Sequence, residues 1–222
     1  MSLPKCQHRV HDCLIGFAAS FWLHYNYILV LLYEPATYLG DPRHPHESLY
    51  QSQYLLYCLQ AAKSYFTTLL ALPVEGFQYR SFASSAELVT VIVTTARILL
   101  LEAEGWDLEL ARQTLDFPGV LDSLMGQFNA LIPLRKNKLG QLGLSREIDN
   151  AEDDTDDNLV KYVIKLQSIK KWFEARVASL NPLAAGSDDS AAFLPVGWED
   201  SLGKDNQFWL GLLGNDAWDF NF

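Results

Sequence analysis

The sequence is poor in residues that several large classes of proteins require. It holds three cysteines, an odd number without paired spacing, which argues against a disulfide framework and indicates a reducing compartment. Its 17 Lys and Arg residues stand against 27 Asp and Glu, and the resulting net charge of −10 argues against a surface that grips nucleic acid. It has few strand patterns, and none of them is paired by a hairpin turn.

The sequence also lacks a hydrophobic run well suited to a membrane span. Residues 13–33 are apolar but carry His24 and Asn26 in their middle, and residues 88–101 form too short a run and contain Arg97. A signal peptide is a weak alternative, because no small-residue cleavage site follows the first stretch. We expect both stretches to be helices buried in a protein core, and a membrane protein built on them stays the minor alternative.

Motifs for catalysis and for phosphate binding are missing as well. There is no G-x-S-x-G elbow, no G-x-G-x-x-G loop and no P-loop. One Cys/His cluster is present near the N-terminus, formed by Cys6, His8, His11 and Cys13. Its spacing differs from that of the usual zinc sites, so we favour ordinary residues at a helix start and expect no metal site.

The remaining titratable side chains do not assemble a nucleophile, a base and an orienting group. His44 and His46 belong to the Pro-containing segment 41–48, which predicts an exposed loop. We therefore expect no catalytic residue, no cofactor and no enzymatic activity. The alternative is a helical enzyme or small-molecule-binding protein with His24, Glu102 and Glu104 near a pocket.

What the sequence does contain is helical periodicity. The chain is 49% hydrophobic, and its apolar residues recur every three or four positions. Ser48 with Gln51 and Ser84 with Glu87 fit the capping-box pattern at two helix starts, and we expect the second of these helices to be central. We predict an all-α fold, an irregular bundle of about six or seven helices.

Prolines, glycine and acids suggest where these helices end. We expect Pro73 to stop the helix from Ser48, and Gly105 to close the helix from Ser84. A short helix is expected over residues 107–114, followed by one with Pro118 in its first turn that ends at Pro133. The acidic run 146–158 predicts a solvated loop that leads into a helix over 159–180.

These patterns divide the chain into three parts. Residues 1–182 form the expected helical regulatory domain, residues 183–204 are small and polar as in a linker, and residues 205–222 form an acidic-aromatic C-terminal segment. The alternation of acids and aromatics is typical of amphipathic activation segments, whose aromatics a partner's apolar groove can capture. The expected coactivator contacts are Phe208, Trp209, Leu212, Leu213, Trp218 and Phe220. A segment that folds back onto its own domain is an equally weighted alternative.

Several stretches carry a resemblance to a known family. They are "LHYNYILVLLYEPA" at 23–36, "CLQAAKSYF" at 58–66, "GWDLELARQTLDFPGVLDSL" at 105–124 and "FWLGLLGNDAWDF" at 208–220. In this order the chain resembles the C-terminal regulatory region of fungal binuclear zinc-cluster transcription factors, beginning inside their middle homology region. The resemblance implies transcription regulation, a nuclear location and coactivator partners.

The sequence departs from this family in one large respect. The six-cysteine cluster that holds two zinc ions and reads DNA has no counterpart among its three cysteines. Glu34 also stands where the family commonly has a basic residue before the proline. We therefore expect no direct nucleic-acid contact, and a fragment or a product without its DNA reader. Upstream helices that normally pack on this body would then be missing and would leave apolar surface exposed. A small-molecule effector and a homo-oligomer are further expectations that no residue identifies.

Overall fold

The computed structural model describes residues 4–38, 48–74, 82–103, 105–141, 154–180 and 208–209. In these ranges all regular structure is helical, which confirms the expected all-α class. They contain five long helices and the short helix α4, so the expected count of six or seven is slightly off. The elements are α1 (Pro4–Tyr33), the 3-10 helix η1 (Glu34–Thr37), α2 (Ser48–Leu70), α3 (Phe82–Ile98), α4 (Leu108–Thr114), α5 (Phe117–Gln141) and α6 (Asp154–Leu180).

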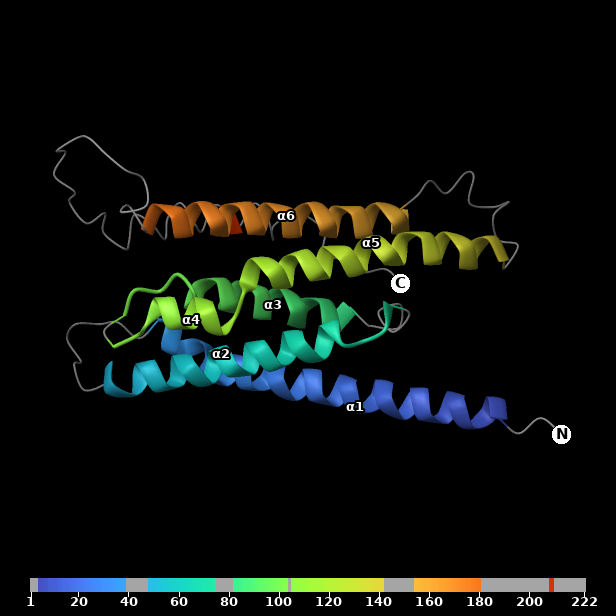
Figure 1. The fold of residues 1–222 in the computed structure, drawn as a ribbon, viewed down its shortest axis with the longest axis horizontal. Helices are drawn as coiled ribbons and strands as arrows, with labels where there is room; N and C mark the ends of the chain where they lie inside the picture. Colours follow the sequence, from blue (N-terminus) through green and yellow to red (C-terminus); the bar gives the residue numbers. More distant parts are fainter. Residues whose placement is uncertain are drawn as a thin grey trace.

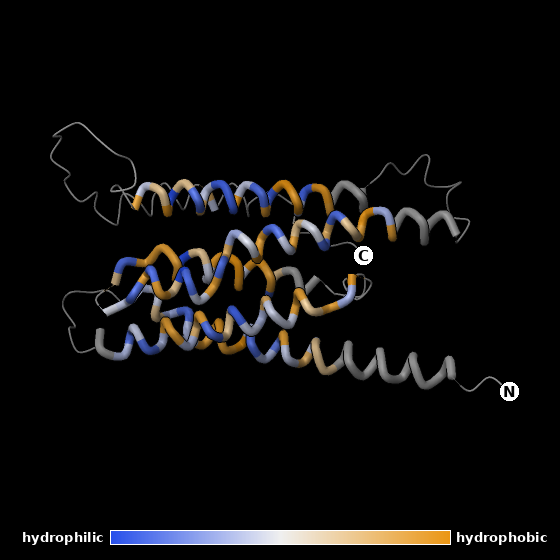
Figure 2. The backbone as a smooth tube through the Cα atoms, in the orientation of Figure 1, coloured by the Kyte–Doolittle hydropathy of each residue, from blue (hydrophilic) through white to orange (hydrophobic). Residues whose placement is uncertain are grey.

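The helices lie roughly side by side, with α1 and α6 at opposite edges of the molecule (Figure 1). The two most extensive pairings join helices of the same edge, α1 with α2 and α5 with α6. Helix α3 contacts α1, α2 and η1, and α2 also contacts α5, which links the two pairs. Hydrophobic and hydrophilic stretches alternate along α6, the pattern expected of a helix that buries one face (Figure 2).

Helix α3 occupies the centre, as its apolar sequence predicts. Val91, Ile92, Ala96 and Ile98 are almost completely buried. Its buried Thr95 remains hydrogen-bonded within the helix, since its hydroxyl donates to Val91 O over 2.6 Å. A buried hydroxyl without a partner would destabilise the fold, so this bond allows polar residues in the central helix.

The end of α3 is closed by side chains from the segment that follows it. Trp106 donates its indole N–H to Ile98 O over 3.1 Å, and Arg112 donates from Nε to Leu99 O over 3.0 Å. These bonds satisfy carbonyl groups that a helix end leaves without an intrahelical donor. Gly105 makes the turn between the end of α3 and Trp106, with φ of 72°. A Cβ at this position would also lie 3.2 Å from the side chain of Ser52.

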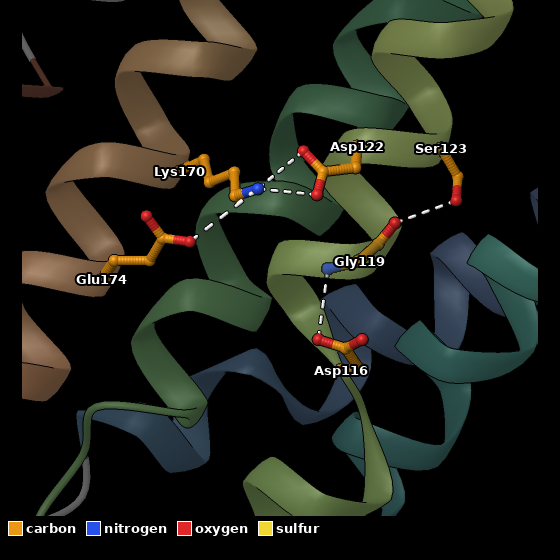
Figure 3. A network of polar contacts seen from close by, with 6 residues as sticks. All are labelled: Asp116, Gly119, Asp122, Ser123, Lys170 and Glu174. Carbon is orange, nitrogen blue, oxygen red and sulfur yellow. Dashed lines mark hydrogen bonds and ion pairs between the residues drawn. The ribbon is translucent and has the colours of Figure 1, made fainter.

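The next two helices start at aspartate caps. Asp107 accepts from the Leu110 N–H at the start of α4, as expected for a helix over 107–114. Asp116 accepts from the Gly119 N–H over 3.1 Å at the start of α5, which places Pro118 in the first turn as predicted (Figure 3). Residues 106–110, with the sequence WDLEL, therefore help to connect α3 to α5.

Four predicted boundaries are wrong. Helix α5 continues through Pro133, which is exposed, so solvent can satisfy the carbonyl that the proline leaves unpaired. Helix α3 starts at Phe82, so Ser84 lies inside its first turn rather than before it, and α3 ends at Ile98 well before Gly105. Helix α6 starts at Asp154, because acids are favourable beside the positive end of the helix dipole.

The helix over the stretch 13–33 is only partly buried, in contrast to the expectation of a core helix. Leu23 and Val30 of α1 are buried against the other helices. On its remaining surface, Phe21 is 67% exposed and Leu32 is 63% exposed. The helix assignment is therefore confirmed, whereas complete burial is wrong.

Cys58 lies at the contact between α1 and α2. It is completely buried, and its Sγ donates a hydrogen bond to Val30 O over 3.6 Å. Burial raises the pKa of this thiol to about 12, and the negative charge of Glu34 adds to the effect. The neutral thiol is therefore the form that the fold favours.

This pKa predicts how stability depends on pH. The folded pKa lies above the ordinary value of 9.0, so the contribution of the neutral thiol is complete below pH 9 and is lost as pH rises toward about 12. We expect the stability difference between the wild type and Cys58→Ala to fall by up to about 1.4 kcal/mol per pH unit in that window. Urea unfolding from about pH 8 to about pH 11 measures it, and a constant difference would contradict the assignment.

Candidate protein-interaction site

Three aromatic side chains meet on α6, and we call them the aromatic anchor: Trp172, Phe208 and Trp209. The Trp172 and Phe208 rings are stacked, with centroids 5.1 Å apart and planes 7° from parallel. Trp209 meets Trp172 edge to face at 5.1 Å and 73°, and it meets Phe208 at 5.2 Å and 75°. Each ring therefore contacts both others in a geometry that aromatic quadrupoles favour.

The anchor is continuous with the core of the helical body. Trp209 is only 9% exposed, while Trp172 and Phe208 are partly buried against the core. Each aromatic pair of this kind contributes about 0.5–1.5 kcal/mol beyond the burial of its area. The start of the C-terminal segment is thus attached to α6 by contacts of real energetic weight.

Helix α6 can present Trp172 to the C-terminal segment because the next residue, Phe173, occupies the core-facing position. The buried stripe of α6 steps by three and four residues and consists of Leu159, Tyr162, Leu166, Ile169 and Phe173. Phe173 packs edge to face on Phe117 of α5, with centroids 5.0 Å apart. Trp172 precedes Phe173 and so lies at the margin of the stripe, where it can contact both the core and the C-terminal segment.

An ion pair holds α6 against α5 close to the anchor. Lys170 Nζ lies 2.6 and 2.7 Å from the two carboxylate oxygens of Asp122, and 3.8 Å from Glu174 Oε1 (Figure 3). The hydrogen bond to Asp122 is the main cause that raises the pKa of Lys170, and Coulomb attraction to Asp122 and Glu174 adds to it. Because these groups are solvent-accessible, the bridge orients α6 more than it stabilises it.

Of the six expected coactivator contacts, the structure describes two. Phe208 and Trp209 lie together in the anchor, on the chain's own α6. Leu212, Leu213, Trp218 and Phe220 lie outside the described residues. For the first two residues, the structure therefore has the arrangement of the alternative in which the segment packs on its own domain.

Sequence reasoning missed Trp172 as a partner of the segment. It was predicted only as part of a helix over 159–180, and nothing in its spacing distinguishes it from a core residue. An aromatic residue one position before a buried one was the available signal. Such a residue lies beside the buried stripe rather than within it, where it can serve a second contact.

The alternative site around His24, Glu102 and Glu104 is not assembled in the described part of the chain. His24 Nδ1 instead lies 2.8 Å from Oε1 of Glu87, near the start of α3. Glu102 is exposed and follows the opposite end of that 17-residue helix, and Glu104 lies outside the description. Asp107, the neighbouring acid, is occupied as the cap of α4.

The structure describes the other candidate metal ligands only in part. Cys6, His8, His11 and Cys13 fall within α1, but their side chains lie outside the description. His44 and His46 are outside it altogether. Among the described residues, no three His, Cys, Asp or Glu side chains are grouped closely enough to hold a metal ion.

A search of the helices in the described ranges found none that could cross a membrane.

Comparisons with protein-family models, with curated proteins and with solved structures found no match to this chain.

The contact between Trp172 and Trp209 makes a quantitative prediction. We expect Trp172→Ala and Trp209→Ala each to lower the free energy of unfolding by about 3 kcal/mol, since each removes a large partly or fully buried ring. Because the rings touch, the double variant should lose about 0.5–1.5 kcal/mol less than the sum. Urea unfolding of the three variants measures the coupling. Lys171→Ala, an exposed neighbour on α6, is the control, and strictly additive losses would contradict the anchor.

Proposed function

We propose that this chain is the regulatory and transactivation region of a nuclear transcription regulator of the fungal zinc-cluster type. Its helical body holds the start of an acidic-aromatic C-terminal segment, and a coactivator protein binds that segment. The chain acts as a binding module and not as an enzyme.

One observation carries the proposal: Phe208 and Trp209, two of the side chains expected to contact a coactivator, pack on Trp172 of the body. A partner that needs these two side chains has to displace them from α6. The apparent affinity of the partner is then its intrinsic affinity multiplied by the fraction of molecules in which Phe208 and Trp209 are released. This arrangement would make the body a regulator of the segment rather than a passive support.

The composition of the segment supports the same proposal. Residues 205–222 combine aromatics with Asp205, Asp216 and Asp219. Acids beside aromatics favour rapid, oriented association with a groove that has a basic rim, while the aromatics provide most of the binding free energy. One of the four stretches that carry the resemblance to the transcription-factor family, residues 208–220, lies in this segment.

A reporter experiment on the full chain tests the proposal. The chain is fused to an unrelated DNA-binding module, and transcription is measured for the wild type, for Trp218→Ala/Phe220→Ala and for Trp172→Ala. We expect the first variant to lose most activation, because it removes partner contacts. Trp172→Ala should raise activation several-fold, since the loss of two ring contacts of about 1 kcal/mol each increases the released fraction by up to about thirty-fold.

The control variant is Lys171→Ala, which should leave activation unchanged. No activation by any of the chains would contradict the transactivation function. Activation that disappears in Trp218→Ala/Phe220→Ala but does not change in Trp172→Ala would retain the function of the segment and reject its control by the body. Equal cellular amounts of each fusion, checked by immunoblot, separate these effects from loss of folding.

A further inference from the structure

Helix α1 exposes a continuous apolar stripe, which we call the α1 stripe: Phe21, Tyr25, Ile28 and Leu32. Their exposed fractions are 67%, 44%, 48% and 63%. Two further large side chains, Trp22 at 49% and Leu31 at 43%, lie at its margins. Such a concentration of exposed large hydrophobic residues on one helix marks an interaction surface rather than ordinary surface.

The α1 stripe lies on the face of α1 opposite to the one that packs in the core. The buried positions of the helix include Leu23, Asn26 and Val30. At 100° per residue, the α1 stripe is centred about 160° away from them. A helix that is apolar on both faces is expected to be covered on both, and the described part of the chain leaves the α1 stripe exposed.

The spacing of the α1 stripe is the same in both directions along the helix. Its four residues are separated by four, three and four positions. If a second copy packs antiparallel about a two-fold axis between positions 26 and 27, Phe21 faces Leu32 of that copy and Tyr25 faces Ile28. Each contact then pairs an aromatic side chain with a branched aliphatic one, and a two-fold interface generates each pair twice. Alternating steps of four and three residues are also those of antiparallel helix pairs with interlocking side chains.

Charge does not oppose this pairing at the stripe itself. Residues 13–33 contain no Asp, Glu, Lys or Arg, so no like charges meet when two α1 helices approach. Each chain carries a net charge of −10, however, and the two bodies repel one another at longer range. Since salt screens this repulsion and leaves apolar burial in place, self-association should strengthen as ionic strength rises.

The exposed area reaches the size of a specific interface when all six side chains are covered. With about 200 Å² for the full surface of a large apolar side chain, the exposed fractions of the six side chains amount to about 600 Å² per copy. Complete burial of these side chains in two copies would remove at most about 1,200 Å² from solvent, the lower limit of specific and stable protein interfaces.

From these observations we propose that the chain forms a homodimer through antiparallel packing of the α1 stripe against that of a second copy. The inference is independent of the proposed role in transcription, because it uses only the surface of α1. Aromatic anchor and dimer surface lie on helices at opposite edges of the molecule (Figure 1), so one partner can bind at α6 while a second copy covers α1.

Sedimentation of the full chain, together with charge variants, tests the dimer. The wild type should sediment at about twice 25.1 kDa, and more completely at high salt than at low salt. Phe21→Glu/Leu32→Glu places like charges opposite each other across the two-fold axis and should raise the dissociation constant about 100-fold or more. Phe21→Lys/Leu32→Lys should do the same. An equimolar mixture of the two variants should restore the dimer, because each Glu then faces a Lys.

The control is Val160→Glu/Ile164→Glu, which adds the same charge to two exposed apolar residues of α6 and should leave the dimer intact. Circular dichroism of every variant reports whether the helices are retained. A monomeric wild type, or one that forms aggregates of no fixed size, would overturn the proposal. A dimer that survives both charge variants would overturn it as well, since its interface would lie elsewhere. Variants that disrupt the dimer individually but do not restore it when mixed would reject the antiparallel register.

Discussion

The enclosure of α3 is the constraint on which the rest of the structure depends. Most of its described side chains in the second half are buried, and two of these are threonines. Helices α1 and α2 therefore have to cover α3, and the segment after α3 has to close its end. Trp106 and Arg112 provide that closure by donating to Ile98 O and Leu99 O. Partial burial lowers the pKa of the Arg112 guanidinium, because the side chain loses solvent where it reaches the carbonyl. The positions of α4 and α5 follow from this closure.

Much of the fold follows from the sequence, because helical periodicity is a local signal. The start of α2 at Ser48, the cap at Asp107 and the place of Pro118 all follow from rules that involve a few neighbouring residues. Pro133 and Ser84 were misjudged because their environment decides their role: an exposed helix tolerates a proline, and a helix start depends on what packs before it. The apolar sequence of residues 13–33 predicted a helix correctly but did not reveal that Phe21 and Leu32 are exposed, because exposure depends on which other helices pack on α1.

The candidate site was harder to predict because it joins residues that are far apart in the chain. The aromatic residues at 208 and 209 stood out by composition, whereas Trp172 looked like any other residue of an amphipathic helix. The composition indicates that such side chains will be buried against some surface. Only the packing identifies α6 as that surface for Phe208 and Trp209. The other titratable candidates show the same limit, since His24 finds Glu87 on a different helix, 63 positions away.

The aromatic anchor joins positions 172 and 209, with residues 181–207 between α6 and the attached pair. By the loop-closure relation, the entropy lost on joining two points of a chain grows only with the logarithm of the intervening length, and a doubling adds about 0.6 kcal/mol. Insertions and deletions within 181–207 should therefore be close to neutral for the anchor, whereas a single exchange at Trp172 is not. In related sequences, this intervening stretch is where length would be free to change, while the tryptophan on α6 would change only together with its aromatic partners.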